Sequence, residues 1–153
     1  MPKRGFGYYW DLIETPVTIF AVFSLITMIV PIENWIGQLF STILSILIMV
    51  FSFGLVGYNV SKEKDAPYGK TGAYAGLVIG LISAIVAILT FYVFPARFAE
   101  AIQGAVQAGA SAMTTELFIK IGLFAGIVIN PAIYAGIVAL LTWISRFIFK
   151  RKK

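Results

Sequence analysis

The stretch TGAYAGLVIGLISAIVAILTFYVFPA, residues 71–96, contains no charged side chain and is apolar over almost its whole length. Three further uncharged runs cover residues 15–32, 34–61 and 121–145. A helix of about 20 mostly apolar residues crosses the ~30 Å hydrocarbon core of a bilayer. The sequence therefore predicts an all-α integral membrane protein, folded as an antiparallel bundle of four transmembrane helices. The expected spans are 16–32, 35–59, 71–94 and 117–147.

The composition limits the chemistry that this chain can perform. Of its 153 residues, 59% are hydrophobic and 12% are charged, which indicates one transmembrane domain over residues 1–153. Cysteine and histidine are both absent, so thiolate nucleophiles, imidazole bases and the commonest metal ligands are missing. The seven carboxylates all fall outside the four uncharged runs, whereas a proton-coupled transporter needs one inside the membrane. We therefore expect no enzymatic activity, no cofactor and no metal site.

The basic residues lie at the predicted membrane edges. Ten of the twelve lysines and arginines fall in the N-terminal segment, in residues 61–70 and after residue 145. Since positive charge favours cytoplasmic segments, we expect both termini and the 61–70 loop to face the cytoplasm at the cell membrane. This distribution accounts for the net charge of +5 without a nucleic-acid partner. The final cluster could contact anionic lipid headgroups, although retention of a cytoplasmic tail also explains it; it comprises Lys150, Arg151, Lys152 and Lys153.

Local signals indicate where the helices begin and end. Thr15 can supply an N-cap hydroxyl and Pro16 suits the first helical position, so the first helix is predicted to start at Pro16. Between the third and fourth spans, residues 96–115 combine small and polar residues with apolar side chains at near-helical spacing. A short amphipathic helix is expected there, on the outer face of the membrane. Thr114 or Thr115 is then expected to cap the last helix.

Glycines recur at four-residue spacing in two of the uncharged runs. Gly72, Gly76 and Gly80 share one face of the third predicted helix, and Gly122 and Gly126 repeat the spacing in the fourth. Such a glycine zipper lets another backbone approach closely in lipid, where dispersion contacts replace the missing hydrophobic drive between helices. The spacing predicts helix packing, either within one bundle or between protomers.

Polar residues inside the apolar runs are candidates for a pocket or a pathway. Pro131 follows one of them and lacks an N–H, so the carbonyl four residues earlier loses its helical donor and a kink is expected. The pattern agrees with two alternatives: hydrogen bonds to a neighbouring helix beside that kink, or a ligand or water site. The candidates are a broken stripe in the second run, Gln38, Ser41, Ser45 and Ser52, and two residues of the fourth, Asn130 and Tyr134.

These observations favour a non-enzymatic function. The first hypothesis is a helix-packing subunit or self-assembling scaffold of a membrane complex. Its partners would be the lipid bilayer and either further copies of this chain or other membrane protein subunits. The alternative is a small homo-oligomeric channel or transporter for a neutral or weakly polar solute, lined by the polar stripe and Asn130.

Overall fold

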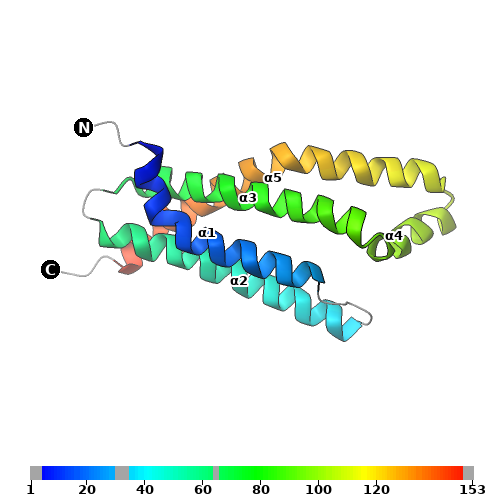
Figure 1. The fold of residues 1–153 in the computed structure, drawn as a ribbon, viewed down its shortest axis with the longest axis horizontal. Coiled ribbons are helices and arrows are strands. Elements are labelled where there is room, and N and C mark those ends of the chain that lie inside the picture. The colour runs from blue at the N-terminus through cyan, green and yellow to red at the C-terminus, as the bar shows by residue number, and fades with distance from the viewer. Residues whose placement is uncertain (1–4, 30–34, 64–65, 150–153) are drawn as a thin grey trace.

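The computed structural model describes residues 5–29, 35–63 and 66–149, which form five helices and no strand. Four of these helices are long and apolar enough to cross a membrane, and α4 is a short helix between the last two. The prediction of an all-helical chain with four such helices is confirmed. The helices are α1 (Phe6–Ile29), α2 (Trp35–Lys62), α3 (Tyr68–Val93), α4 (Ala96–Gln107) and α5 (Ala112–Phe149) (Figure 1).

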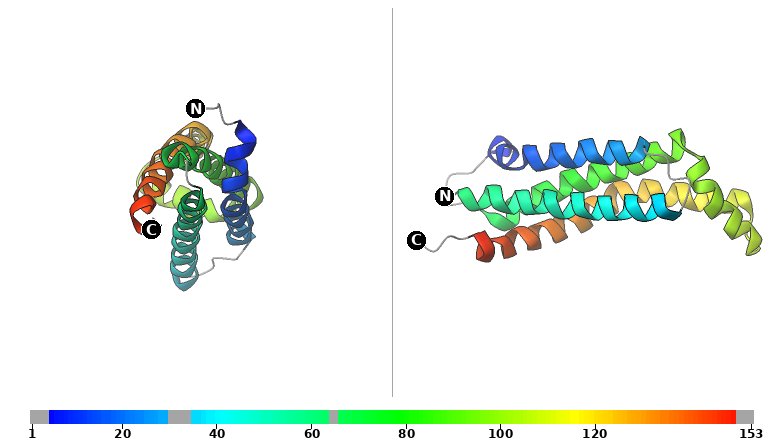
Figure 2. Two further views of the ribbon diagram at one scale, coloured as in Figure 1. Left: turned by 90° about the vertical axis from the view of Figure 1, so that its left-hand side faces the viewer. Right: turned by 90° about the horizontal axis from the view of Figure 1, so that it is seen from below.

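The four long helices lie side by side along the length of the molecule (Figures 1 and 2). Asn59, near the end of α2, donates a hydrogen bond to the carbonyl of Leu12, near the start of α1. Tyr74, near the start of α3, stacks on Tyr9 of α1 with ring centroids 4.7 Å apart. The chain direction therefore reverses between α1 and α2 and again between α2 and α3. α4 and the first turns of α5 extend past the ends of α1 and α2 (Figure 2).

The prediction that the first helix starts at Pro16, capped by Thr15, was wrong, because α1 begins at Phe6 and contains Pro16. A proline inside a helix removes the donor for the carbonyl four residues earlier, here that of Leu12. The Asn59 side chain replaces this donor from α2, with Nδ2 3.0 Å from the Leu12 oxygen. Because a second helix supplies the missing hydrogen bond, α1 can continue through Pro16.

The segment between α3 and α5 contains the short helix that was predicted within residues 96–115. This helix, α4, ends at Gln107. Gly109, with φ of 94°, and Ala110 donate to the carbonyls of Val106 and Ala105, which is the hydrogen-bond pattern of a glycine-terminated helix end. α5 then begins at Ala112, so neither Thr114 nor Thr115 caps it.

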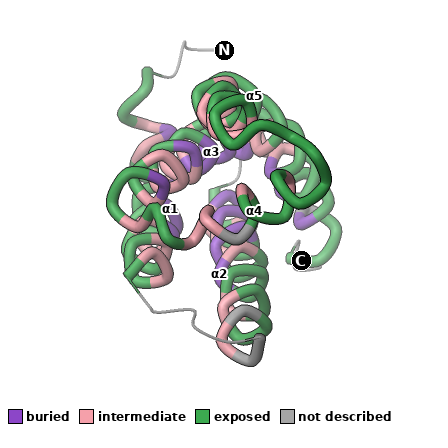
Figure 3. Tube along the Cα trace, turned by 90° about the vertical axis from the view of Figure 1, so that its right-hand side faces the viewer, coloured by how far each residue is buried: buried purple, intermediate pink, exposed green. Residues whose placement is uncertain are grey.

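The buried residues lie where the long helices face one another (Figure 3). Each long helix contributes one apolar residue with no exposed surface, namely Ile13 of α1, Val56 of α2, Ile79 of α3 and Val138 of α5. They belong to a single apolar cluster. Most large apolar side chains on the outer faces are exposed. Long helices that are apolar on every face are typical of membrane spans rather than of the surface of a soluble domain.

Candidate functional site

The most extensive contact between described helices is that of α3 with α5. Gly72, Gly76 and Gly80 are all buried on the face of α3 that meets α5. A Cβ built on Gly72 would lie 2.7 Å from the Cα of Ala139, and one on Gly80 would lie 2.6 Å from the Cα of Pro131. A Cβ on Gly76 would collide with the carbonyl of Tyr134. We call this contact the glycine seam; only residues without a side chain fit along it.

The two glycines singled out in the fourth run lie elsewhere. A Cβ at Gly122 would meet nothing within 4 Å, and one at Gly126 would meet only Asn130 of its own helix, whose Nδ2 lies 3.5 Å away. Neither glycine therefore packs against another described helix. The sequence analysis missed Gly57 of α2, where an added Cβ would lie 2.6 Å from the Cβ of Ser145. Its partner is on α5, and a four-residue spacing rule does not detect a single close approach of this kind.

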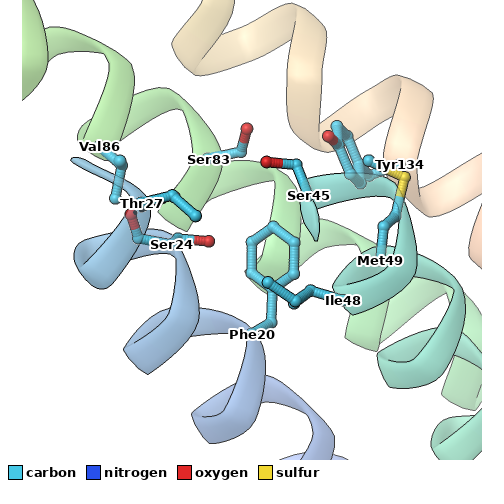
Figure 4. A pocket seen from close by; sticks show the side chains of 9 residues that line it. All are labelled: Phe20, Ser24, Thr27, Ser45, Ile48, Met49, Ser83, Val86 and Tyr134. Atoms are coloured by element: carbon cyan, nitrogen blue, oxygen red, sulfur yellow. Dashed lines mark hydrogen bonds between the residues drawn. The ribbon is translucent and has the colours of Figure 1, made fainter. Parts of the chain in front are cut away.

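A cavity of about 190 Å³ lies between α1, α2, α3 and α5. Five of the side chains around it carry a hydroxyl group, and the others are apolar (Figure 4). None of them is charged. We call this space the hydroxyl cavity. Its lining residues are Phe20, Ser24 and Thr27 of α1, Ser45, Ile48 and Met49 of α2, Ser83 and Val86 of α3, and Tyr134 of α5.

The hydroxyl groups around the cavity differ in their hydrogen bonding. Thr27 donates to the carbonyl of Ser24 at 2.9 Å, and Ser45 donates to the carbonyl of Ser41 at 2.8 Å. Such bonds to the preceding turn are common for serine and threonine within helices. Among the described residues, the hydroxyls of Ser24, Ser83 and Tyr134 have no hydrogen-bond partner. Three donors are therefore available to whatever occupies the cavity.

The structure separates the polar residues that the sequence grouped together. Ser45 and Tyr134 line the hydroxyl cavity, and Ser41 contributes only the carbonyl that accepts from Ser45. Ser52 is fully buried away from the cavity, and its hydroxyl has no partner among the described residues. Asn130 is half-buried beside Gly126 and does not line the cavity. The side chain of Gln38 and the cluster Lys150, Arg151, Lys152 and Lys153 lie outside the described residues.

Sequence reasoning missed three of the five hydroxyl-bearing residues that line the cavity. Ser24 and Thr27 stand three residues apart in the first uncharged run, so they share a face of α1, and this spacing could have identified them. Ser83 lies in the third run, three residues after Gly80. Its place on the cavity wall follows from the glycine seam, which fixes the rotation of α3 about its axis.

The side chains around the hydroxyl cavity offer hydrogen bonding through their hydroxyl groups. A serine hydroxyl is a weak nucleophile unless a general base lies beside it, and no carboxylate, amine or imidazole lines the cavity. In the part of the chain that the structure describes, no group of three or more acidic, histidine or cysteine side chains could hold a metal ion. The ion pair between Glu116 and Lys120, 2.7 Å apart, lies on the edge of a second cavity between α3, α4 and α5.

Comparison of this chain with protein-family models, with curated proteins and with solved structures gave no significant match.

Proposed function

We propose that this chain is a non-enzymatic integral membrane protein that acts as a helix-packing subunit or self-assembling scaffold of a membrane complex. Its four long helices would form an antiparallel transmembrane bundle, with both termini and residues 61–70 in the cytoplasm. Support comes from the exposed apolar faces of these helices and from the basic residues at one predicted side of the membrane.

The observation that carries the packing role is the length of α5. Its 38 residues span about 57 Å at 1.5 Å per residue, whereas the hydrocarbon core is about 30 Å thick. The uncharged run 121–145 alone extends over about 37 Å, which already exceeds the core unless the helix tilts. Residues 112–120 therefore lie at the headgroups or beyond them.

This projecting part of α5 is nevertheless apolar. The side chains of Met113, Leu117 and Phe118 are 84%, 56% and 68% exposed, respectively. Exposing large apolar side chains outside the hydrocarbon is unfavourable, at about 25 cal/mol for each Å² in contact with water. A contiguous apolar surface in such a position is typical of a protein contact site. The partner would be a second copy of this chain or another membrane subunit.

Photo-crosslinking in native membranes tests this proposal. A benzoylphenylalanine residue placed at Met113 or at Phe118 should capture protein, either as a dimer of this chain or as an adduct with a different subunit. The matched control is the same residue at Leu140, which is exposed on α5 within the uncharged run and should contact lipid. If positions 113 and 118 give no more protein adduct than position 140, the projecting end is not a contact site and the proposal is wrong.

A further inference from the structure

We infer that the hydroxyl cavity is a binding site for a small neutral solute with several hydroxyl groups, such as a short polyol, and that it opens toward the end of the molecule where α1 stops. This inference rests on the transmembrane location proposed above but not on the packing role, because the cavity lies within a single chain.

The first step concerns the hydroxyl groups that lack partners. Ser24, Ser83 and Tyr134 come from three different helices, yet all face the same space (Figure 4). The three residues are half-buried. A hydroxyl group without a hydrogen bond is unfavourable in an apolar medium, and the bilayer core offers no water to compensate. A chain that only needed to fill this space could do so with apolar side chains. The arrangement therefore points to a polar occupant.

The second step concerns the size and charge of the site. A cavity of about 190 Å³ is several times larger than the ~30 Å³ that a water molecule occupies in the liquid. The lining has no charged residue, and an ion without a counter-charge in an apolar medium is strongly disfavoured. The apolar part of the wall, including Phe20 and Ile48, suits the carbon skeleton of a solute. Hydroxyl groups opposite an apolar wall are complementary to a small neutral polyol.

The third step concerns the route into the cavity. Ser24 lies five residues before the end of α1 at Ile29, which is a rise of about 8 Å along the helix. In the other direction, Ser24 is eighteen residues from the start of α1 at Phe6, or about 27 Å. The shorter route into the cavity therefore starts at the end of the molecule where α1 ends and α2 begins.

The absence of cysteine from the sequence allows a direct test by single cysteine substitutions. Methanethiosulfonate reagents modify a thiolate, which forms in water rather than in lipid. In proteoliposomes, Ser45→Cys and Ser83→Cys should react with hydroxyethyl methanethiosulfonate at least ten times faster than two controls. The controls are Ser52→Cys, which is fully buried on the same helix as Ser45, and Leu47→Cys, which is exposed on the outer face of α2. Because the two test positions lie on different helices, failure of one variant to fold leaves the other.

Protection distinguishes a solute site from a cavity that holds only water. Glycerol at molar concentration should slow the modification of Ser45→Cys and Ser83→Cys several-fold, whereas sucrose at the same osmolality is too large to enter and should not. Rates equal to those of the two controls would show a dry cavity, and rapid modification that no small polyol slows would show water alone; either result overturns the inference. A charged, impermeant reagent should reach Ser24→Cys faster from the side where α1 ends and α2 begins, and the opposite preference would refute the proposed direction of access.

Discussion

Replacing Gly76 with alanine adds one methyl group at the centre of the glycine seam. The added Cβ would lie 2.5 Å from the Cα of Ala135 and would collide with the carbonyl of Tyr134. Carbon atoms in favourable contact lie about 3.5–4.0 Å apart, so α3 and α5 must separate locally by about 1 Å. Both collision partners are backbone atoms, which cannot rotate away as a flexible side chain could. Overpacking of this kind typically costs about 1–3 kcal/mol.

The chain contains a matched control for this change. Gly122 also lies inside a long helix, but a Cβ built there meets nothing within 4 Å. Replacing a glycine in a helix interior with alanine is worth about 0.5–1 kcal/mol in favour of the helix at either site. This contribution cancels when the two variants are compared, so the difference between them measures the cost of overpacking alone. Gly122→Ala should be neutral or stabilising, and Gly76→Ala should be less stable than Gly122→Ala by about 1–3 kcal/mol.

The assay is equilibrium unfolding of the purified protein in mixed detergent micelles. Wild type, Gly76→Ala and Gly122→Ala are compared in the same detergent at the same protein concentration, so that any self-association is held constant. Equal free energies of unfolding for the two variants would show that α3 and α5 are not in backbone contact at Gly76. The reasoning on the glycine seam would then be refuted.

Three further predictions concern a hydrogen bond between helices, a buried hydroxyl group and the orientation of the chain in the membrane. Asn59→Ala should lower the free energy of unfolding by about 1–2 kcal/mol, because the Leu12 carbonyl loses its donor. Pro16→Ala gives residue 16 an N–H that can bond to the same carbonyl, so a double-mutant cycle should show that Asn59→Ala costs less in the Pro16→Ala background. Thr142→Val should be neutral or stabilise by up to about 1 kcal/mol, because the buried hydroxyl of Thr142 has no partner among the described residues; a clear loss of thermal stability would show that this hydroxyl does form a hydrogen bond. Alkaline phosphatase should be inactive when fused after residue 153 and active when inserted within residues 108–111, and the reverse pattern would contradict the proposed orientation.

The helices were predictable where one local property sufficed. An uncharged apolar run indicates a long apolar helix, and each of the four runs overlaps a different long helix over most of its length. Four-residue spacing placed Gly72, Gly76 and Gly80 on one helix face, and that face meets α5. Spacing alone could not assign the partner of Gly122, because an exposed glycine in lipid and a packed one obey the same periodicity. The difference depends on which helices lie nearby, which is a property of the tertiary structure.

The boundary errors have a similar origin. Proline is favourable at the first position of a helix and unfavourable inside one, so local preference alone placed Pro16 at a helix start. The structure instead places Pro16 inside α1, with Asn59 supplying the missing donor from a position 47 residues away from Leu12. The other error is the cap predicted at Thr114 or Thr115, because α5 begins at Ala112. The short helix before α5 could end at several positions within residues 96–115. The positive φ of Gly109 selects one of them, because left-handed backbone is accessible to glycine at little cost.

The hydroxyl cavity and the contact between Asn59 and Leu12 arise from the same physical requirement. In the bilayer core, a donor or acceptor without a partner in the protein or in a bound molecule is unfavourable. From the sequence one can identify which groups need partners, namely the carbonyl freed by a proline and the hydroxyls of an apolar run. The Leu12 carbonyl receives its donor from another helix, whereas Ser24, Ser83 and Tyr134 face a shared space without one. That contrast is the reason to look for a bound solute at the hydroxyl cavity rather than at every polar residue of the spans.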